Sequence, residues 1–273
     1  ADKGKMIALR IDTGRIRTLA PIRAETVLVE RGETAALVSP ARDGYREVAE
    51  GLRGDLSRLT GVEWPPAVDG DEWQDSRGAS DLIALGHAGN NRLLRRLHDL
   101  RYLADSDYPS EGARVVSIHN PFGDGRNVLA VLGRTREVCA RGAEQLREVV
   151  TERDGRWLVE GRLLIQEPRP KTPDLDEMLR AGRAVRRARS GRPSAFLQAL
   201  NCLNATGEER WARAFIELVT PYATGEILLS FWRMSAVDFW TDALATAWDC
   251  AEEFPFFTDE ERLLVANFVA SCT

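Results

Sequence analysis

Lysine is nearly absent from this chain: Lys3, Lys5 and Lys171 are the only lysines among its 273 residues, and arginine supplies the other positive charges. An arginine cluster therefore need not mark a phosphate site. We interpret the arginines between residues 180 and 192 as a solvated helix face and linker, with an anionic polymer as the alternative ligand. The net charge of −5 argues against a general nucleic-acid binder, which would usually be basic. We expect no nucleic-acid partner.

Metal and nucleotide motifs are missing as well. The chain has four cysteines and three histidines, and neither residue type follows the spacing of a zinc site. The Walker spacing and the G-x-G-x-x-G fingerprint are also absent. No apolar run approaches the length that a membrane span requires. We expect no metal, no cofactor and no membrane partner.

Strand and helix patterns alternate up to about residue 168, which predicts an α/β layer fold. Two β-rich runs, 24–30 and 34–39, flank a turn and predict a hairpin. Further strands are predicted at 81–85, 115–118, 128–132, 157–159 and 163–165, the last two as a closing hairpin. Helices follow the predicted N-caps Asp43, Asn90 and Thr135, and Gly61 ends the first of them.

The pattern changes at prolines 168, 170 and 173, beyond which the sequence predicts no strand. Helices are predicted at 174–189, 193–204, 208–221, 226–233, 235–253 and 259–271. We divide the chain into an α/β accessory domain (1–168), a linker with an arginine-rich helix (169–192) and a region of helical hairpins (193–273). The last predicted helix has apolar residues that need partners, so we expect the remainder of a longer chain to follow.

The loop 119–127 offers one candidate site, because it carries a histidine and two glycines. Phosphate binding needs backbone N–H groups at a helix N-terminus, whereas an apolar strand follows this loop. We therefore favour a connection between two strands, with His119 and Asn120 as a minority prospect for facing a ligand. Asn90, which follows a glycine-rich turn, could bind an anion, although an ordinary β–α connection is favoured there too.

A second candidate is the stretch 231–257. On a helix, Asp238, Asp242 and Asp249 fall within roughly 40° of each other, and Trp240 and Trp248 lie on the other side. Such a helix could bind sugars through its acids and indole rings, or it could simply bury its tryptophans and expose its aspartates. We name no catalytic residue. The candidate substrate-binding residues are Trp232, Arg233, Asp238, Trp240, Trp248, Asp249, His119 and Asn120.

Several segments resemble known proteins. "AALVSPARDGYREVAEGLRGDLSRLTGVEWP" is similar to the start of the α/β domain that precedes the catalytic module in alpha-glucuronidases and hexosaminidases. "DLIALGHAGNNRLLRRL" and "VVSIHNPFGDGRNVLAVLGRTREVCARGAEQL" continue that pattern, which spans roughly residues 34 to 150. "LNCLNATGEERWARAFIEL" and "AWDCAEEFPFFTDEERLLVANFV" resemble hairpins of the (α/α) toroid of heparinase-like polysaccharide lyases and related glycoside hydrolases.

The resemblance implies the N-terminal part of a secreted or periplasmic enzyme that degrades a polysaccharide, with an incomplete toroid. A lyase, which abstracts the C5 proton of a uronic acid, and a hydrolase, which uses paired carboxylates, both stay open. The alternative is a non-catalytic module that binds carbohydrate or serves as a scaffold. A third hypothesis is an intracellular α/β protein that binds a small anion at Asn90.

Overall fold

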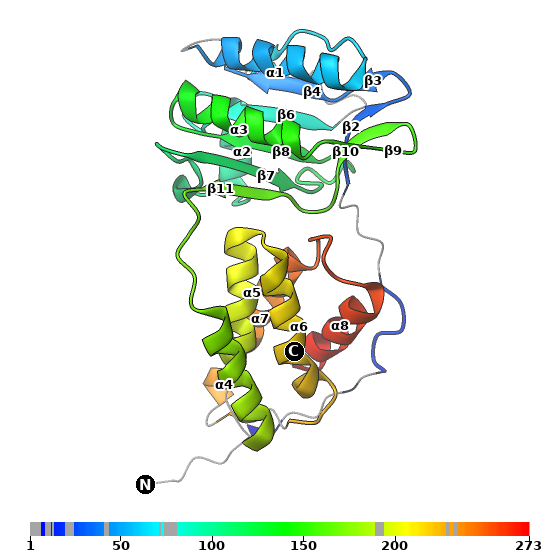
Figure 1. Cartoon of the computed structure of the whole chain (residues 1–273), viewed down its shortest axis with the longest axis vertical. Coiled ribbons are helices and arrows are strands. Elements are labelled where there is room, and N and C mark those ends of the chain that lie inside the picture. Colours follow the sequence, from blue (N-terminus) through cyan, green and yellow to red (C-terminus); the bar gives the residue numbers. More distant parts are fainter. Residues whose placement is uncertain are drawn as a thin grey trace. The chain divides into compact units, whose positions relative to one another are not determined.

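The computed structural model describes residues 7–8, 12, 14–19, 25–40, 44–70, 72–73, 81–188, 194–227, 230–231 and 234–272 (Figure 1). The chain divides into two compact units, an α/β unit of residues 23–170 and a helical unit made of residues 1–22 and 171–273. The expected order, a mixed α/β region followed by a helical region, is confirmed.

The start of the chain differs from expectation, because residues 1–22 group with the helical unit and not with the α/β unit. Two short strands explain part of this grouping: β1 (Ile7–Ala8) pairs antiparallel with β12 (Ser230–Phe231). The expectation of no strand beyond residue 168 is therefore wrong. So is the helix at 226–233, since Ser230 and Phe231 are extended to form this pair.

The α/β unit is built around a six-stranded sheet in the order β11-β7-β8-β6-β4-β5. Its strands are β4 (Ala36–Ser39), β5 (Val68–Asp69), β6 (Leu82–Gly86), β7 (Ala113–Ile118), β8 (Val128–Leu132) and β11 (Leu164–Glu167). The four strands β5, β4, β6 and β8 run parallel, whereas β7 and β11 form an antiparallel margin. The connection from β7 to β8 confirms the strand connection predicted for the loop 119–127.

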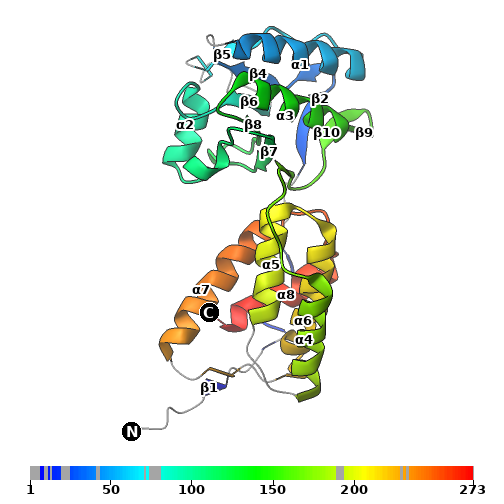
Figure 2. The same cartoon turned by 60° about the vertical axis from the view of Figure 1, so that its left-hand side comes forward.

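Helices cover both faces of this sheet, as Figure 2 shows. Successive residues of a strand point to opposite faces, so each strand contributes side chains to the core on both sides of the sheet. In β6, Ile83 and Leu85 face α1 (Tyr45–Thr60) and α3 (Arg136–Glu148), whereas Leu82 and Ala84 face α2 (Arg92–Asp99). All five residues of β6 are buried, which is typical of a central parallel strand.

A second sheet of four strands has the order β3-β2-β10-β9. Its strands are β2 (Thr26–Glu30), β3 (Glu33–Thr34), β9 (Thr151–Arg153) and β10 (Arg156–Val159). Both predicted hairpins need correction. Only β2 and β3 form the first, since residues 36–39 belong to the six-stranded sheet, where Leu37 and Val38 are buried on opposite faces. The closing hairpin does not form, because β10 pairs with β2 and β9 while β11 pairs with β7.

The helical unit contains α4 (Leu175–Ala188), α5 (Ser194–Thr206), α6 (Glu209–Ala223), α7 (Met234–Ala251) and α8 (Asp259–Cys272). Alternate helices pack together: α5 against α7, and α6 against both α4 and α8. Consecutive helices also pack, namely α4 on α5, α5 on α6 and α7 on α8. The helices thus form two layers, α5 and α7 in one and α4, α6 and α8 in the other (Figures 1 and 2).

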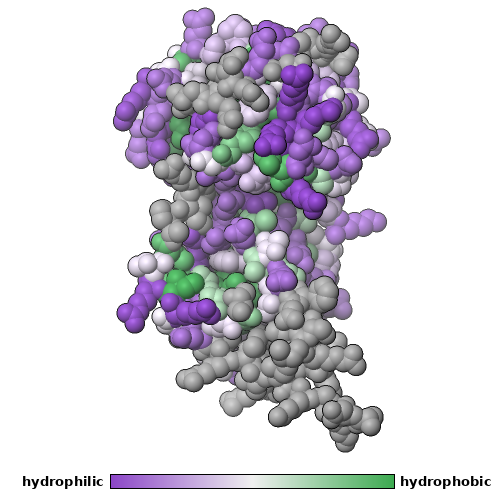
Figure 3. Space-filling model, turned by 180° about the vertical axis from the view of Figure 1, so that it is seen from behind, coloured by the Kyte–Doolittle hydropathy of each residue, from purple (hydrophilic) through white to green (hydrophobic). Residues whose placement is uncertain are grey.

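Aromatic side chains fill the space between these layers. Phe196 of α5 lies at the centre, with ring centroids 5.2 Å from Tyr222, 5.6 Å from Trp240 and 5.8 Å from Phe268. Figure 3 shows one face of the molecule, on which hydrophilic residues cover most of the described surface and apolar residues are scattered. Among the described residues, the exposed large apolar side chains are Leu59, Leu100 and Tyr102.

Candidate functional site

The carboxyl edge of the six-stranded sheet is the first place where the fold suggests a ligand. The chain leaves β4 towards α1 on one face and leaves β6 towards α2 on the other. Neighbouring parallel strands whose connections diverge in this way leave a crevice at their carboxyl ends, and open α/β sheets bind ligands there.

Asn91 lies at this edge, between the ends of β4 and β6. Its side-chain amide nitrogen donates to the Leu85 carbonyl oxygen at 2.9 Å and lies 3.4 Å from that of Val38, so it bridges the ends of β6 and β4. Its Oδ1 accepts from the backbone N–H groups of Leu93 and Leu94 at the start of α2. Only 1% of Asn91 is exposed. The protein's own side chain therefore takes the polar groups that a ligand would use.

The sequence predicted the wrong asparagine as the cap of α2. Asn90 lies one residue earlier, and its Oδ1 accepts from the His87 backbone N–H at 2.9 Å, which closes the turn after β6. A Cβ atom at Gly86 would lie 2.6 Å from that oxygen, and Gly86 has a φ of +114°, so glycine is required there. Two adjacent asparagines both satisfy the cap pattern, and only the backbone path shows which one caps.

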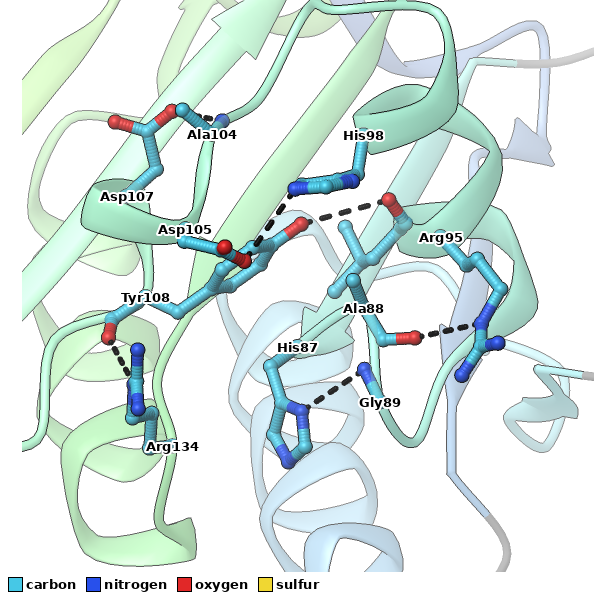
Figure 4. Close-up of polar contacts among 11 residues, drawn as sticks. His87, Ala88, Gly89, Arg95, His98, Ala104, Asp105, Asp107, Tyr108 and Arg134 are labelled. Atoms are coloured by element: carbon cyan, nitrogen blue, oxygen red, sulfur yellow. Dashed lines mark hydrogen bonds and ion pairs between the residues drawn. The ribbon is translucent and has the colours of Figure 1, made fainter.

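His87 lies at the same edge, among aromatic rings (Figure 4). Its Nδ1 accepts from the Gly89 backbone N–H at 3.0 Å, so the proton of a neutral ring sits on Nε2. The rings of Tyr45 and Tyr108 approach its ring edge-on, each with a centroid distance of 6.4 Å. Burial raises the pKa of Tyr108, and Arg134 donates to the backbone oxygen of this tyrosine at 3.0 Å. These contacts tie the loops of the edge together.

His119 and Asn120 lie at the opposite, amino edge of the parallel strands. Asn120 adopts a left-handed backbone with a φ of +43°. Its Oδ1 accepts from the Gly125 N–H at 2.7 Å, and its own N–H donates to Asn127 Oδ1 at 2.9 Å. The polar groups of Asn120 thus hold the loop closed, which is the work of a turn residue.

Asp81 organises this amino edge, and sequence reasoning missed it. Its two carboxylate oxygens accept from the backbone N–H groups of Val27 and Asn127, at 2.6 and 2.7 Å. Burial raises the pKa of Asp81. The two hydrogen bonds and the nearby charges of Arg126 and His119 lower this pKa, but the effect of burial is larger. An acid directly before a buried strand was the available signal, but the sequence does not show that β2 lies beside it.

Two of the tryptophans predicted to contact sugar, Trp240 and Trp248, pack within the helical unit. Trp248 is 5% exposed and stacks on Phe215 at 5.7 Å, with Phe257 at 5.1 Å. Trp240 packs against Phe196 and Phe268. Asp249 is exposed, as is Asp242. This is the arrangement of an amphipathic helix in a packed core.

The other candidates on this stretch lie outside what the structure describes. Trp232 and Arg233 fall outside the described residues, and Asp238 lies in α7 at a position where only the backbone is described. The structure therefore brings Trp240 and Trp248 into one core and leaves Asp249 on the surface. His119 and Asn120 belong to the other unit.

Two arginines of the cluster on α4 are paired with acids. Arg183 donates to Glu217 at 2.9 Å, and Arg186 binds both carboxylate oxygens of Glu226 at 2.8 and 2.7 Å. A bidentate pair gives two of the guanidinium N–H groups an acceptor and offsets the positive charge, so it reduces the attraction of the arginine for a polyanion. These two contacts favour the interpretation of this stretch as a solvated helix face.

A small cavity lies between α4, α5 and α6, lined by residues that include Phe196, Tyr222 and Ile227. Within the described ranges, no group of three or more His, Cys, Asp or Glu side chains is placed to hold a metal ion. No helix in the described part of the chain is long and apolar enough to cross a membrane.

No protein-family model and no curated protein matches this chain.

Proposed function

We propose that this chain is the N-terminal part of a carbohydrate-active enzyme that degrades a polysaccharide. In this proposal the α/β unit is an accessory domain, and the helical unit contributes the first hairpins of an (α/α) toroid. The protein acts in the periplasm or outside the cell. Whether the reaction is lytic or hydrolytic stays open.

The two-layer packing of the helices carries this proposal. In a toroid or an α-solenoid, successive helices alternate between two layers, and each helix packs on the next helix of its own layer. The contacts of α5 with α7, and of α6 with α4 and α8, follow that rule. Asn204 adds a polar contact within one layer, since its Nδ2 donates to the Ala247 backbone oxygen of α7 at 2.7 Å.

The buried side chain of Asn91 at the carboxyl edge of the sheet supports an accessory role for the α/β unit. Asn91 satisfies the carbonyl group of Leu85 and caps α2, so a ligand at the carboxyl edge of the sheet would have to displace a buried amide. Displacement would leave buried polar groups unpaired, which costs about 1–3 kcal/mol for each group. This cost disfavours the hypothesis of an anion-binding α/β protein.

Affinity electrophoresis tests the carbohydrate partner. The full chain is run through gels that contain a uronic-acid polysaccharide, such as alginate or polygalacturonate, or a neutral glucan. We expect selective retardation by one uronic-acid polymer. The double change Asp242→Ala and Asp249→Ala removes two exposed carboxylates of α7 that would repel such a polyanion, so it should not weaken the retardation. Equal mobility in all gels would contradict the proposal.

The gene sequence after the codon for Thr273 separates the enzyme from the alternative of a non-catalytic module. The enzyme requires further helical hairpins to complete the toroid and to supply the catalytic residues. We also expect no unsaturated uronic-acid product, measured by ultraviolet absorbance, when this chain alone is incubated with the polymer. Clear turnover would show that the present residues already contain the catalytic machinery.

A further inference from the structure

The N-terminal segment lies along α8, far from it in sequence (Figure 1). We name residues 12 and 14–19 the N-terminal strap. Ile16 and Leu19 of the strap are half-buried, and the other residues of the strap are exposed. The strap therefore makes its contacts mainly through its backbone.

The side-chain amide of Asn267 binds both the backbone N–H and the carbonyl oxygen of one strap residue, Ile16. Its Oδ1 accepts from the Ile16 N–H at 2.6 Å, and its Nδ2 donates to the Ile16 carbonyl oxygen at 3.0 Å. A side-chain amide that pairs with both backbone groups of one residue reproduces the bonding of a neighbouring β-strand. Asn267 is 3% exposed with the strap in place, and its Nδ2 also donates to the Leu263 carbonyl oxygen of α8 at 3.0 Å, so its own helix holds the amide in the orientation that binds the strap.

Two further contacts extend this recognition by one turn. Ser271 Oγ accepts from the Asp12 backbone N–H at 2.9 Å. The Arg15 guanidinium donates to the Ala270 carbonyl oxygen. Ala270 is among the last four residues of α8, whose carbonyl groups have no partner within the helix, and the positive charge also suits the C-terminal end of the helix dipole.

The strap covers one flank of α8, beside the stripe of that helix that packs into the core. Val265, Phe268 and Cys272 are the buried apolar residues of this stripe. At 100° per residue, Asn267 and Ser271 lie about 130° and about 90° from the centre of the stripe, both on the same side of it. The strap therefore supplies the polar partner for a flank of α8 next to its core contacts.

We propose that this side of α8 is a docking surface for an extended peptide backbone, and that its occupant is the strap of the same chain. Asn267 and Ser271 select the backbone shape of the peptide, and Arg15 anchors it at the helix end. Together with the pair of β1 and β12, the docking joins the start of the chain to the helical unit, although the α/β unit lies between them in sequence. This inference does not depend on the carbohydrate proposal.

Amide hydrogen exchange on the full chain tests the docking. We expect the Ile16 amide to exchange at least about tenfold faster in Asn267→Leu than in the wild type, because its acceptor is gone. Asn204→Leu removes an equivalent amide from another helix of the same unit, and we expect it to leave the Ile16 amide protected. Equal Ile16 exchange in the wild type and in Asn267→Leu would overturn the proposal.

Two further measurements cover the other outcomes. If Asn267→Leu does not fold, Ser271→Ala changes a half-buried residue, and faster exchange of the Asp12 amide supports the docking while unchanged exchange opposes it. Dilution of the wild-type protein distinguishes the occupant. Protection that is independent of concentration indicates the strap of the same chain, whereas protection that falls on dilution indicates a second copy and overturns the assignment.

Discussion

A single side chain, that of Asn91, joins three elements of the α/β unit: β4, β6 and α2. We expect Asn91→Ala to lower the free energy of unfolding by about 2–4 kcal/mol, since it removes a helix cap and leaves the buried Leu85 carbonyl group unpaired. Urea denaturation measures the change. Asn90→Ala, which removes one hydrogen bond to the His87 N–H, should cost about 1 kcal/mol. Equal losses would contradict the role given to Asn91.

Asp81 provides a prediction with a definite sign of pH dependence. Burial raises its pKa in the folded state above that of an unfolded aspartate. Its contribution to stability is therefore fully present below the unfolded pKa and is lost as the pH rises through the folded pKa. We expect the wild type to lose stability relative to Asp81→Asn as the pH rises across this acidic window.

Urea denaturation of both proteins at several pH values tests this sign, because the difference between them isolates Asp81. A difference that moves the other way with rising pH would show that the hydrogen bonds from Val27 and Asn127 outweigh burial. At a fixed neutral pH, Asp81→Asn should still cost about 1–3 kcal/mol, since one of those two N–H groups would face an NH₂ group instead of an acceptor.

Two consecutive residues of α7 have different surroundings, since Trp248 is buried and Asp249 is exposed. We expect Trp248→Ala to cost about 3–5 kcal/mol, because it opens a cavity between Phe215 and Phe257. Asp249→Ala, at the next residue and exposed, should change stability by less than about 0.5 kcal/mol. Chemical denaturation followed by circular dichroism measures both. If Trp248→Ala lowers the free energy of unfolding only slightly, the structural role of this indole is wrong and stacking on a sugar becomes the better interpretation.

Elements with strong local signals were predictable from the sequence. The central strands β6 and β8 are continuous apolar runs, and Thr135 caps α3 by accepting from the Val138 N–H. Gly61 ends α1 in the left-handed conformation, as its position suggested. Periodicity and capping depend on neighbours along the chain, which is why these features were visible.

Pairing between distant segments was not predictable. The runs at 157–159 and 163–165 look like a hairpin, yet β10 and β11 join different sheets. Asp81 and Asn267 act on backbone groups 54 and 251 residues away, at Val27 and Ile16. Such partners are chosen by the tertiary fold, so a single sequence holds no local sign of them.

At the scale of the whole molecule, the two units have separate hydrophobic cores. The α/β unit buries apolar residues on both faces of its six-stranded sheet, and the helical unit buries the aromatic cluster around Phe196. Domains that have their own cores can unfold as separate cooperative units. We therefore expect the full chain to unfold in two transitions and not in one.

Single-site variants assign these transitions. We expect Asn91→Ala to lower the midpoint of one transition by several degrees and Trp248→Ala to lower that of the other, since the two residues belong to different cores. Thermal unfolding gives the midpoints, and hydrogen exchange with mass spectrometry identifies the peptides that open in each step. Asn267→Leu should lower the midpoint of only the transition that Trp248→Ala lowers. The reason is that the strap belongs to the helical unit, although it precedes the α/β unit in sequence. A single transition that all three variants shift together would show that the units unfold as one.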